Sequence, residues 1–343
     1  MLAEKLIQNG TLTKEEYVEL LHTITVEEKE MLKRRAVCLR EEYYGNNIYI
    51  RGLIEFTNYC KNNCYYCGIR AENKNVSRYR LSKEEILSCC EHGYQLGFRT
   101  FVLQGGEDTY YNDDKMVDIV ADIHKKYPDC AITLSLGERS FESYKRLKEA
   151  GADRYLLRHE TADKVHYESL HPQTMRFENR QKCILELKQL GYQVGVGFMV
   201  GSPNQTKEHI AKEFLFLKEL EPHMVGIGPF IPHHSTPFKD ETQGNVEDTL
   251  LYLSMIRIIL PKVLLPATTA LGTLDKMGRE KGILSGANVI MPNLSPLKER
   301  KKYELYNNKL CTGEETAEGI RDLEKKLSSI GCKIVCHRGD VID

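Results

Sequence analysis

The chain has 343 residues, of which 41% are hydrophobic and 28% are charged, and its formal net charge at pH 7 is −1. This composition is typical of a globular protein with a sizeable core. The near-neutral charge excludes a global basic field that would attract nucleic acid or an anionic membrane surface, so we predict neither partner. No apolar run reaches the ~20 residues that span a bilayer, and the N-terminal residues lack the pattern of a secretory signal. We therefore expect a cytoplasmic protein.

The chain contains 11 cysteines. An odd number in a large chain without a secretory signal argues against a disulfide framework and favours metal or redox chemistry. Several of the cysteines are nevertheless expected to be structural. Cys38, Cys130 and Cys183 are isolated, and Cys89 and Cys90 are adjacent on an expected helix. We predict that all of these are small, buried apolar side chains.

The first 45 residues are expected to be helical, because Thr13 and Thr25 each precede a Glu-rich turn and are suitable N-caps. Strands and helices then alternate. Strands are predicted at 48–56, 100–103, 131–136, 154–157, 192–200, 224–227, 263–266 and 287–291. Helices are predicted at 83–96, 113–126, 141–150, 177–190, 207–220, 246–260 and 274–283. Gly97, Gly151 and Gly191 each follow a helix and are expected to end it.

Eight strands that alternate with helices predict a parallel sheet, and eight strands also close a (β/α)8 TIM-type barrel. An open doubly wound sheet is the alternative. We predict an α/β protein in three parts. These are a helical N-terminal segment at 1–45, the barrel at 46–295 and a C-terminal extension at 296–343 that packs on the barrel.

Polar and glycine-rich sequences follow the predicted strands. In chain order they are TNYCKNNCYYCG, QGGED, SLGE, RHET, GSPNQT, GPFIPHHSTP, ATTA and MPN. The active site of a (β/α)8 barrel lies at the carboxyl ends of its strands. These motifs therefore predict one shared pocket at that end of the barrel.

Cys60, Cys64 and Cys67 form a C-x3-C-x2-C pattern in the loop after the first strand. Three thiolates this close suit three corners of a 4Fe–4S cluster, which four cysteines normally hold. No fourth cysteine is near in the sequence, so one iron would be open to a small-molecule ligand. Structural zinc is the alternative, but it usually takes four ligands in two pairs. The pattern therefore predicts a reactive metal site.

This loop, including the aromatic Tyr66 before the third cysteine, resembles the signature of the radical S-adenosylmethionine (SAM) superfamily. The resemblance implies one 4Fe–4S cluster and SAM as cofactors, with Cys60, Cys64 and Cys67 as metal ligands and catalytic residues. It also implies reductive cleavage of SAM to a 5′-deoxyadenosyl radical. A barrel suits this chemistry, because its pocket excludes water from the radical.

The QGGED sequence is a candidate for SAM binding. Gln104, Gly105, Gly106 and Glu107 follow the second strand and resemble the superfamily motif that contacts the SAM amino group. Glycine lets the backbone approach a ligand closely, and a carboxylate accepts hydrogen bonds from an ammonium group. A simple turn is the alternative.

Charged residues after the fourth strand complete the predicted site. Glu160 and Arg180 have charges that complement the amine and the carboxylate of SAM, and the resemblance assigns both to SAM. A surface ion pair is the alternative. We predict the substrate end of the pocket at Thr133, Ser135, Arg158, Thr268, Thr269 and Met291. Ordinary barrel packing is the alternative for the last three.

The resemblance extends to one branch of the superfamily, the HydE family of FeFe-hydrogenase maturation enzymes. The resemblance rests on the sequences RGLIEFTNYCKNNCYYCGIRAENKN, RYRLSKEEI, TFVLQGGED, TLSLGE, GADRYLLRHET, FENRQKC, VGIGPFIPH, PATTALGT and GANVIMPN. The resemblance implies a small organometallic substrate, namely an iron precursor that bears CO, cyanide and cysteine. It also implies an electron donor and other hydrogenase maturation proteins as partners.

Two alternatives stand beside this prediction. Within the superfamily, methylornithine synthase and biotin synthase share the general plan and act on a small amino acid or a biotin precursor. In a different class, a non-catalytic iron–sulfur scaffold would carry a precursor to a partner and would need no SAM site.

The sequence departs from its family near the C-terminus. Some HydE proteins hold a second cluster there with cysteines spaced C-x7-C-x2-C. Cys311 matches the first position, but Gly319 and Asp322 occupy the other two. A second cluster of that kind is not expected, and a distorted site that uses Cys332 and Cys336 stays open.

Overall fold

The computed structural model describes residues 1–311 and 316–342. The chain begins with three helices, α1 (Leu2–Asn9), α2 (Lys14–Thr23) and α3 (Val26–Tyr44). As predicted, Thr13 and Thr25 cap the second and third of these. Each hydroxyl accepts a hydrogen bond from the backbone N–H three residues further on, at 3.3 and 3.2 Å.

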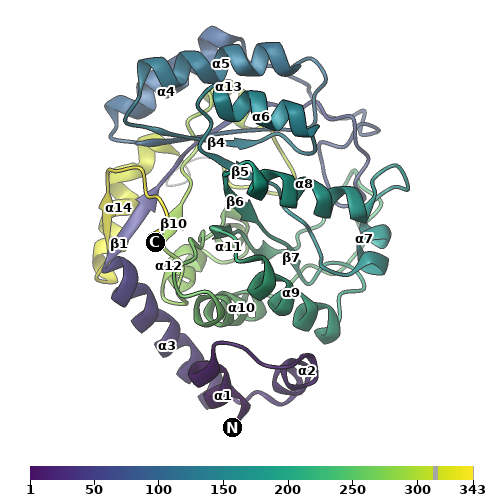
Figure 1. Ribbon diagram of the computed structural model, residues 1–343, viewed down its shortest axis with the longest axis vertical. Coiled ribbons are helices and arrows are strands. Elements are labelled where there is room, and N and C mark those ends of the chain that lie inside the picture. The colour runs from purple at the N-terminus through teal and green to yellow at the C-terminus, as the bar shows by residue number, and fades with distance from the viewer. Residues whose placement is uncertain (312–315, 343) are drawn as a thin grey trace.

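Strands and helices alternate through the rest of the described chain. The strands are β1 (Asn47–Ile50), β2 (Gly52–Thr57), β3 (Thr100–Gly105), β4 (Ala131–Ser135), β5 (Arg154–Leu156), β6 (Gln193–Val196), β7 (Met199–Val200), β8 (Met224–Val225), β9 (Gly228–Pro229), β10 (Val289–Ile290) and β11 (Lys333–Val335). The helices are α4 (Lys83–Gln95), α5 (Asp113–Lys126), α6 (Phe141–Glu149), α7 (Lys164–Leu170), α8 (Phe177–Gln189), α9 (Lys207–Leu220), α10 (Val246–Ile259), α11 (Thr269–Leu274), α12 (Gly278–Ile283), α13 (Leu297–Arg300) and α14 (Ile320–Ser329). Helices lie outside the strands, and the N-terminal helices extend this outer layer because α2 packs on α9 and α3 packs on α10 (Figure 1).

The strands close into the predicted (β/α)8 barrel. Six of them form a parallel sheet in the order β2-β3-β4-β5-β6-β8. The segment 264–266 makes parallel bridges to β8 on one side and to β10 on the other. β10 pairs with β1, and Asn293, which follows β10, makes a bridge to Leu53 of β2. This bridge joins the last part of the barrel to the first strand of the six-stranded sheet. The carboxyl ends of the strands therefore meet at one end of the barrel, where the sequence motifs lie.

Several predicted boundaries were wrong. The strand expected at 48–56 divides at Arg51, because β1 pairs with β10 and β11 whereas β2 pairs with β3. The strand expected at 192–200 divides at 197–198, where the N–H of Gly197 donates to Nδ1 of His159. The segment 263–266 makes isolated bridges instead of a strand.

The helix predicted at 274–283 is two short helices. The first, α11, already begins at Thr269, and Gly278 begins the second, α12. Gly97, Gly151 and Gly191 do follow helices, and each has the positive φ that favours glycine there.

The core consists of apolar side chains between the strands and the helices. Cys89, Cys90, Cys130 and Cys183 are buried in it, as predicted. The prediction for Cys38 was wrong, because this residue is exposed on α3. Among the described residues, no helix is long and apolar enough to cross a membrane.

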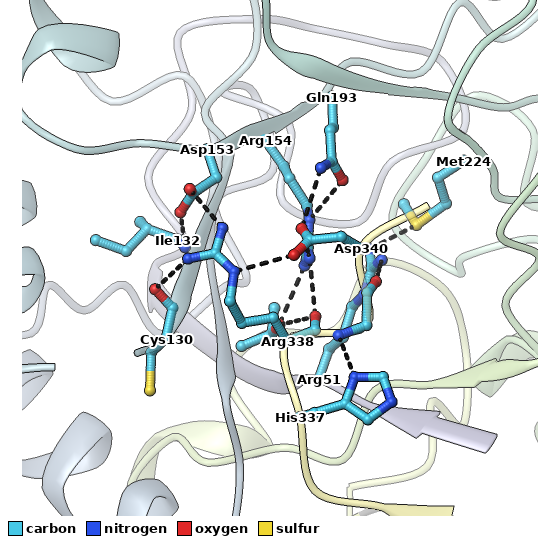
Figure 2. Close-up of polar contacts among 12 residues, drawn as sticks. Arg51, Cys130, Ile132, Asp153, Arg154, Gln193, Met224, His337, Arg338 and Asp340 are labelled. Atoms are coloured by element: carbon cyan, nitrogen blue, oxygen red, sulfur yellow. Dashed lines mark hydrogen bonds and ion pairs between the residues drawn. The ribbon is translucent and has the colours of Figure 1, made fainter. Parts of the chain in front are cut away.

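The C-terminal tail covers the amino end of the barrel, opposite the motifs. Arg338 donates to Asp153 at 2.7 Å and to Asp340 at 3.0 Å, and the carboxylate of Asp340 pairs with Arg154. Arg154 and Gln193 are the first residues of β5 and β6, so these contacts lie at the start of the strands (Figure 2). The cavity described below therefore opens towards the carboxyl end.

Candidate active site

The three cysteines lie on the loop after β2, at the carboxyl end of the barrel, and all are half-buried. Burial, together with the neighbouring Cys60 thiolate, raises the pKa of Cys67 to about 12. Burial and the charges of Cys67 and Cys60 likewise raise the pKa of Cys64. Three thiolates this close repel one another, and a bound cation would stabilise them.

This donor set fits an iron–sulfur cluster better than a single ion. In the described part of the chain, no group of three or more His, Cys, Asp or Glu residues converges closely enough to hold one metal ion. The three thiolates of a cubane bind separate irons and so lie further apart than the ligands of one zinc. Three thiols on one short loop match three corners of a 4Fe–4S cluster.

The QGGED turn packs directly on the cysteine loop. The N–H of Lys61 donates to the carbonyl of Glu107 at 3.0 Å, and Nζ of Lys61 lies 3.1 Å from the Glu107 carboxylate. Glycine is required for this approach, because a Cβ at Gly106 would lie 2.2 Å from the carbonyl oxygen of Tyr59. Glu107 also accepts a hydrogen bond from the N–H of Glu138 at 3.0 Å. Its carboxylate thus connects the loops after β2, β3 and β4.

Glu160 has a left-handed backbone, with a φ of 65°, which residues other than glycine rarely adopt. Its N–H donates to the carbonyl of Gly197 at 3.0 Å, and its side chain lines the central cavity. Its carboxylate accepts two hydrogen bonds from Arg158, at 3.0 and 3.2 Å. Backbone strain at a cavity-lining carboxylate is typical of functional sites.

Arg180 is buried and binds the loops around this carboxylate. Its Nε donates to Glu138 at 2.6 Å, and its Nη1 donates to the carbonyl of Arg158. The structure therefore brings Arg180 next to the RHET sequence. Glu138 was missed as its partner, although the SLGE motif that contains it was recognised.

Tyr66 is anchored by a histidine that the sequence did not reveal. Nδ1 of His171 lies 2.9 Å from the carbonyl of Tyr167, which can only accept, so Nδ1 carries the proton. Nε2 then accepts from the Tyr66 hydroxyl at 3.0 Å. Burial lowers the pKa of His171 to about 4, which keeps this neutral form at physiological pH. The segment after α7 thereby holds the cysteine loop in place.

A cavity of about 280 Å³ extends from the cysteine loop into the barrel. Of the predicted site residues, it is lined by Tyr66, Cys67, Gln104, Arg158, Glu160, Thr268, Thr269 and Met291. Six predicted residues do not line it: Gly105 ends β3, Arg180 is on α8, and Cys60, Cys64, Gly106 and Glu107 belong to the loops around its mouth. The volume suits a small molecule rather than a polymer.

Two predicted substrate residues do not line this cavity. Ser135 is aligned with Gln104 across β4 and β3, near the mouth. Thr133 is two residues earlier on β4, about 6–7 Å nearer the amino end of the strand. It lies beside Arg51 and Arg154 at a separate small cavity of about 10 Å³. The prediction that Thr133 lies at the substrate end of this pocket was therefore wrong.

A segment of the C-terminal extension crosses the mouth of the cavity. We call residues 302–309 the mouth strap. The N–H of Gly68 in the cysteine loop donates to the carbonyl of Leu305 at 2.8 Å, and the N–H of Asn307 donates to the carbonyl of Pro232 at 3.1 Å. Leu305, Tyr306 and Lys309 line the cavity. The strap thus joins the loops after β2 and β9 over the cavity.

Sequence reasoning missed the ion pair beneath this strap. Glu55 of β2 is fully buried, and Nζ of Lys309 lies 2.6 Å from its carboxylate. Asn293 donates to the other carboxylate oxygen at 2.8 Å. The glutamate inside the apolar strand RGLIEFT could have indicated from the sequence that a buried carboxylate needs a partner. Nothing in the sequence placed Lys309 opposite it.

The C-terminal cysteines make separate contacts. Cys332 is buried and accepts a hydrogen bond from Arg40 at 3.1 Å, whereas Cys336 is exposed beside Gly97. Residues 312–315, which lie between Cys311 and Gly319, are outside the described residues. The described contacts give no support to a second metal site.

Comparison with known proteins supports the interpretation of the cysteine loop. Residues 54–217 match the model of the radical SAM superfamily. The chain is 48% identical over 304 residues to the FeFe hydrogenase maturase subunit HydE of Thermotoga maritima. The aligned region covers 89% of this chain and 86% of that protein. It is 30% identical to 3-methylornithine synthase of Methanosarcina acetivorans, over 96% of this chain and 92% of that protein. The crystal structure of methylornithine synthase (PylB) superposes with a TM-score of 0.82 at 27% identity, covering 98% of this chain and 97% of that chain.

Proposed function

The chain belongs to the radical SAM superfamily, and from this premise we propose that it is a HydE-type maturase of FeFe-hydrogenase. Radical SAM enzymes use a 4Fe–4S cluster and SAM, and this chain is an enzyme of that class. The observation that carries the proposal is the position of the three-cysteine loop. It stands at the mouth of a cavity too small for a polymer, in a chain that is 48% identical to HydE of Thermotoga maritima over 89% of its length.

We propose that Cys60, Cys64 and Cys67 hold the cluster. When bound, the reduced cluster and SAM supply a 5′-deoxyadenosyl radical. Gln104, Gly105, Gly106 and Glu107 would position the amino group of SAM, because Glu107 has a carboxylate beside the cysteine loop. Glu160, aimed into the cavity by its left-handed backbone, would accept a hydrogen bond from SAM.

Arg180 would hold the loops that carry these carboxylates and would contribute its charge near the carboxylate of SAM. Its contacts with Glu138 and with the carbonyl of Arg158 support this role. Tyr66 would cover the cluster from the cavity side, fixed by its hydrogen bond to His171. The mouth strap would exclude water from the reacting atoms.

We propose that the substrate is a small cysteine-bound iron–carbonyl–cyanide complex, in the part of the cavity lined by Arg158, Thr268, Thr269 and Met291. Oγ1 of Thr268 is buried and has no hydrogen-bond partner among the described residues, so it has a donor to offer. Ser135, which is aligned with Gln104 across β4 and β3, remains a more distant candidate. The same proposal includes a cytoplasmic location, an electron donor and other hydrogenase maturation proteins as partners.

The test is reconstitution of the protein with iron and sulfide under anaerobic conditions, followed by SAM and reductant. We expect 5′-deoxyadenosine, and an adenosyl adduct with the cysteine-bound iron–carbonyl complex. The protein should also restore hydrogenase activity to an extract that lacks only this step. Turnover with lysine or dethiobiotin instead would move the substrate to the methylornithine synthase or biotin synthase type. A cluster that leaves SAM intact would favour the non-catalytic scaffold.

A further inference from the structure

Arg78 connects both sides of the cysteine loop. Its Nη1 donates to the carbonyl of Asn58, before the first cysteine, and to the carbonyl of Ile69, after the last, at 2.8 Å in the second case. Its Nη2 donates to the carbonyls of Arg70 and Asn73, at 2.7 and 3.2 Å. One planar guanidinium thus satisfies four backbone carbonyls. Arginine is suited to such a site, because its donors have a fixed geometry.

The charge of Arg78 has no carboxylate partner within the described residues. Two neighbouring arginines differ in this respect. Arg70 lies 2.9 Å from the carboxylate of Glu72, and Arg80 donates to Asp108 at 2.7 and 2.9 Å. Arg78 therefore brings a net positive charge to the loop, whereas Arg70 and Arg80 belong to neutral pairs.

This charge lies close to the proposed cluster ligands. Asn58 and Ile69, whose carbonyls Arg78 binds, are each two residues from a cysteine of the loop. Burial raises the pKa of the Cys60 and Cys67 thiols, and the charge of Arg78 opposes this rise. Arginine remains protonated at physiological pH. A fixed positive charge stabilises whichever state of its neighbour is more negative.

We propose that Arg78 positions the cysteine loop and stabilises the reduced state of the cluster. The inference rests on the proposed assignment of the cluster to Cys60, Cys64 and Cys67. In the step concerned, the cluster accepts one electron from an external reductant and becomes more negative by one charge, with no bond made or broken. The nearby net charge is one of the factors that set the potential of an iron–sulfur cluster. The four carbonyl contacts would keep the ligands in position through this change.

The two roles are separable by substitution. Arg78→Gln removes the charge but retains a donor for the carbonyls, and Arg78→Lys retains the charge but cannot reach all four of them. Lys74→Met is the matched control, because Lys74 is an exposed cation of the same loop and its charge is screened by solvent. The potential is measured by an anaerobic redox titration followed by electron paramagnetic resonance, normalised to the iron content. Loop order is measured as the rate at which a chelator removes iron.

In Arg78→Gln, the ratio of reduced to oxidised cluster at a fixed solution potential should fall by roughly tenfold, the order of magnitude expected when one nearby unit charge is removed from a partly buried site. Arg78→Lys should titrate close to the wild type but lose iron several times faster. Lys74→Met should match the wild type in both measurements. An unchanged potential in Arg78→Gln would overturn the electrostatic role, and unchanged iron loss in Arg78→Lys would overturn the positioning role. A wild-type protein without a cluster would instead defeat the cysteine assignment.

Discussion

Nζ of Lys309 lies 2.6 Å from the carboxylate of Glu55, with the two side chains 8% and 0% exposed. The two residues are far apart in the sequence, and each lines the cavity. The lysine belongs to the mouth strap and the glutamate to β2, so this pair fixes the C-terminal extension to the wall of the barrel.

The first prediction tests this buried pair. Lys309→Met should lower the free energy of unfolding of the cluster-free protein by about 3 kcal/mol, because it leaves a buried charge without its partner. The double variant Glu55→Gln/Lys309→Met should recover part of the loss, since neither charge remains. Urea denaturation under anaerobic conditions measures both.

Lys302→Met provides the control for that experiment. Lys302 is on the same strap, but its side chain is 34% exposed and its partner Glu299 also lies 3.8 Å from Lys298, which would remain. We expect its loss to cost less than 1 kcal/mol. Equal losses in the free energy of unfolding for Lys302→Met and Lys309→Met would show that the buried pair stabilises the fold no more than the Lys302 pair does.

The second prediction concerns the cluster ligands. Wild-type protein reconstituted without air should hold about four irons per chain, because three cysteines leave one corner of one cluster open. Alanine at Cys60, Cys64 or Cys67 should abolish the cluster, whereas Cys183→Ala should retain it, because Cys183 is buried on α8 away from the loop. Iron analysis and the visible absorption band measure this. About eight irons in the wild type would require a second cluster.

The third prediction concerns SAM. Glu160→Gln and Arg180→Ala should keep the cluster and weaken SAM binding by about ten- to a hundredfold, the usual loss for one charge-assisted hydrogen bond in a partly dry site. The measurement is the change that SAM causes in the electron paramagnetic resonance spectrum of the reduced cluster, at a series of SAM concentrations. Arg176→Ala is the control, because Arg176 is exposed at the start of the same helix. Variants that respond to SAM like the wild type would remove both residues from the SAM site.

Much of the fold could be predicted from the sequence because local signals repeat regularly. Threonine caps, glycines after helices and polar motifs after strands marked most of the elements. A continuous seventh strand was predicted at 263–266, but Pro266 lacks the N–H that a continuous ladder of hydrogen bonds needs. The first strand was read as continuous because its division at Arg51 depends on β11, which pairs beside it from the far end of the chain.

The site was predictable where it lies on a single motif and less so where distant segments meet. Gln104, Glu160 and Thr268 were all expected near the cysteine loop, and all line its cavity. His171 and Lys309 reach the site from segments that carry no motif, so only the folded chain reveals them. Thr133 was misplaced because a residue's position along a strand, and not its polarity, decides whether it lies at the mouth.

The last prediction concerns pH and the tail at the amino end of the barrel. Asp340 lies between Arg154 and Arg338 (Figure 2). Although burial opposes its ionisation, these two cations lower its pKa to about 2. An aspartate in the unfolded chain has a pKa near 3.9. Because the folded pKa is the lower one, the carboxylate stabilises the fold fully above about pH 4, and this contribution is lost as the pH falls towards 2.

Asp340→Asn should therefore lower the free energy of unfolding at pH 7 by roughly 1 kcal/mol, a figure reduced for solvent screening because this side chain is 36% exposed. The difference from the wild type should shrink as the pH falls from 4 to 2, since the wild-type carboxyl then becomes neutral as well. Urea midpoints at pH 7, 4 and 2.5 measure it. Asp322→Asn is the matched control, because that carboxylate is exposed on α14 and pairs with the exposed Lys325 at 3.1 Å. A difference for Asp340→Asn that stays constant with pH would show that the amide disturbs packing and that the ion pairs of the tail contribute nothing.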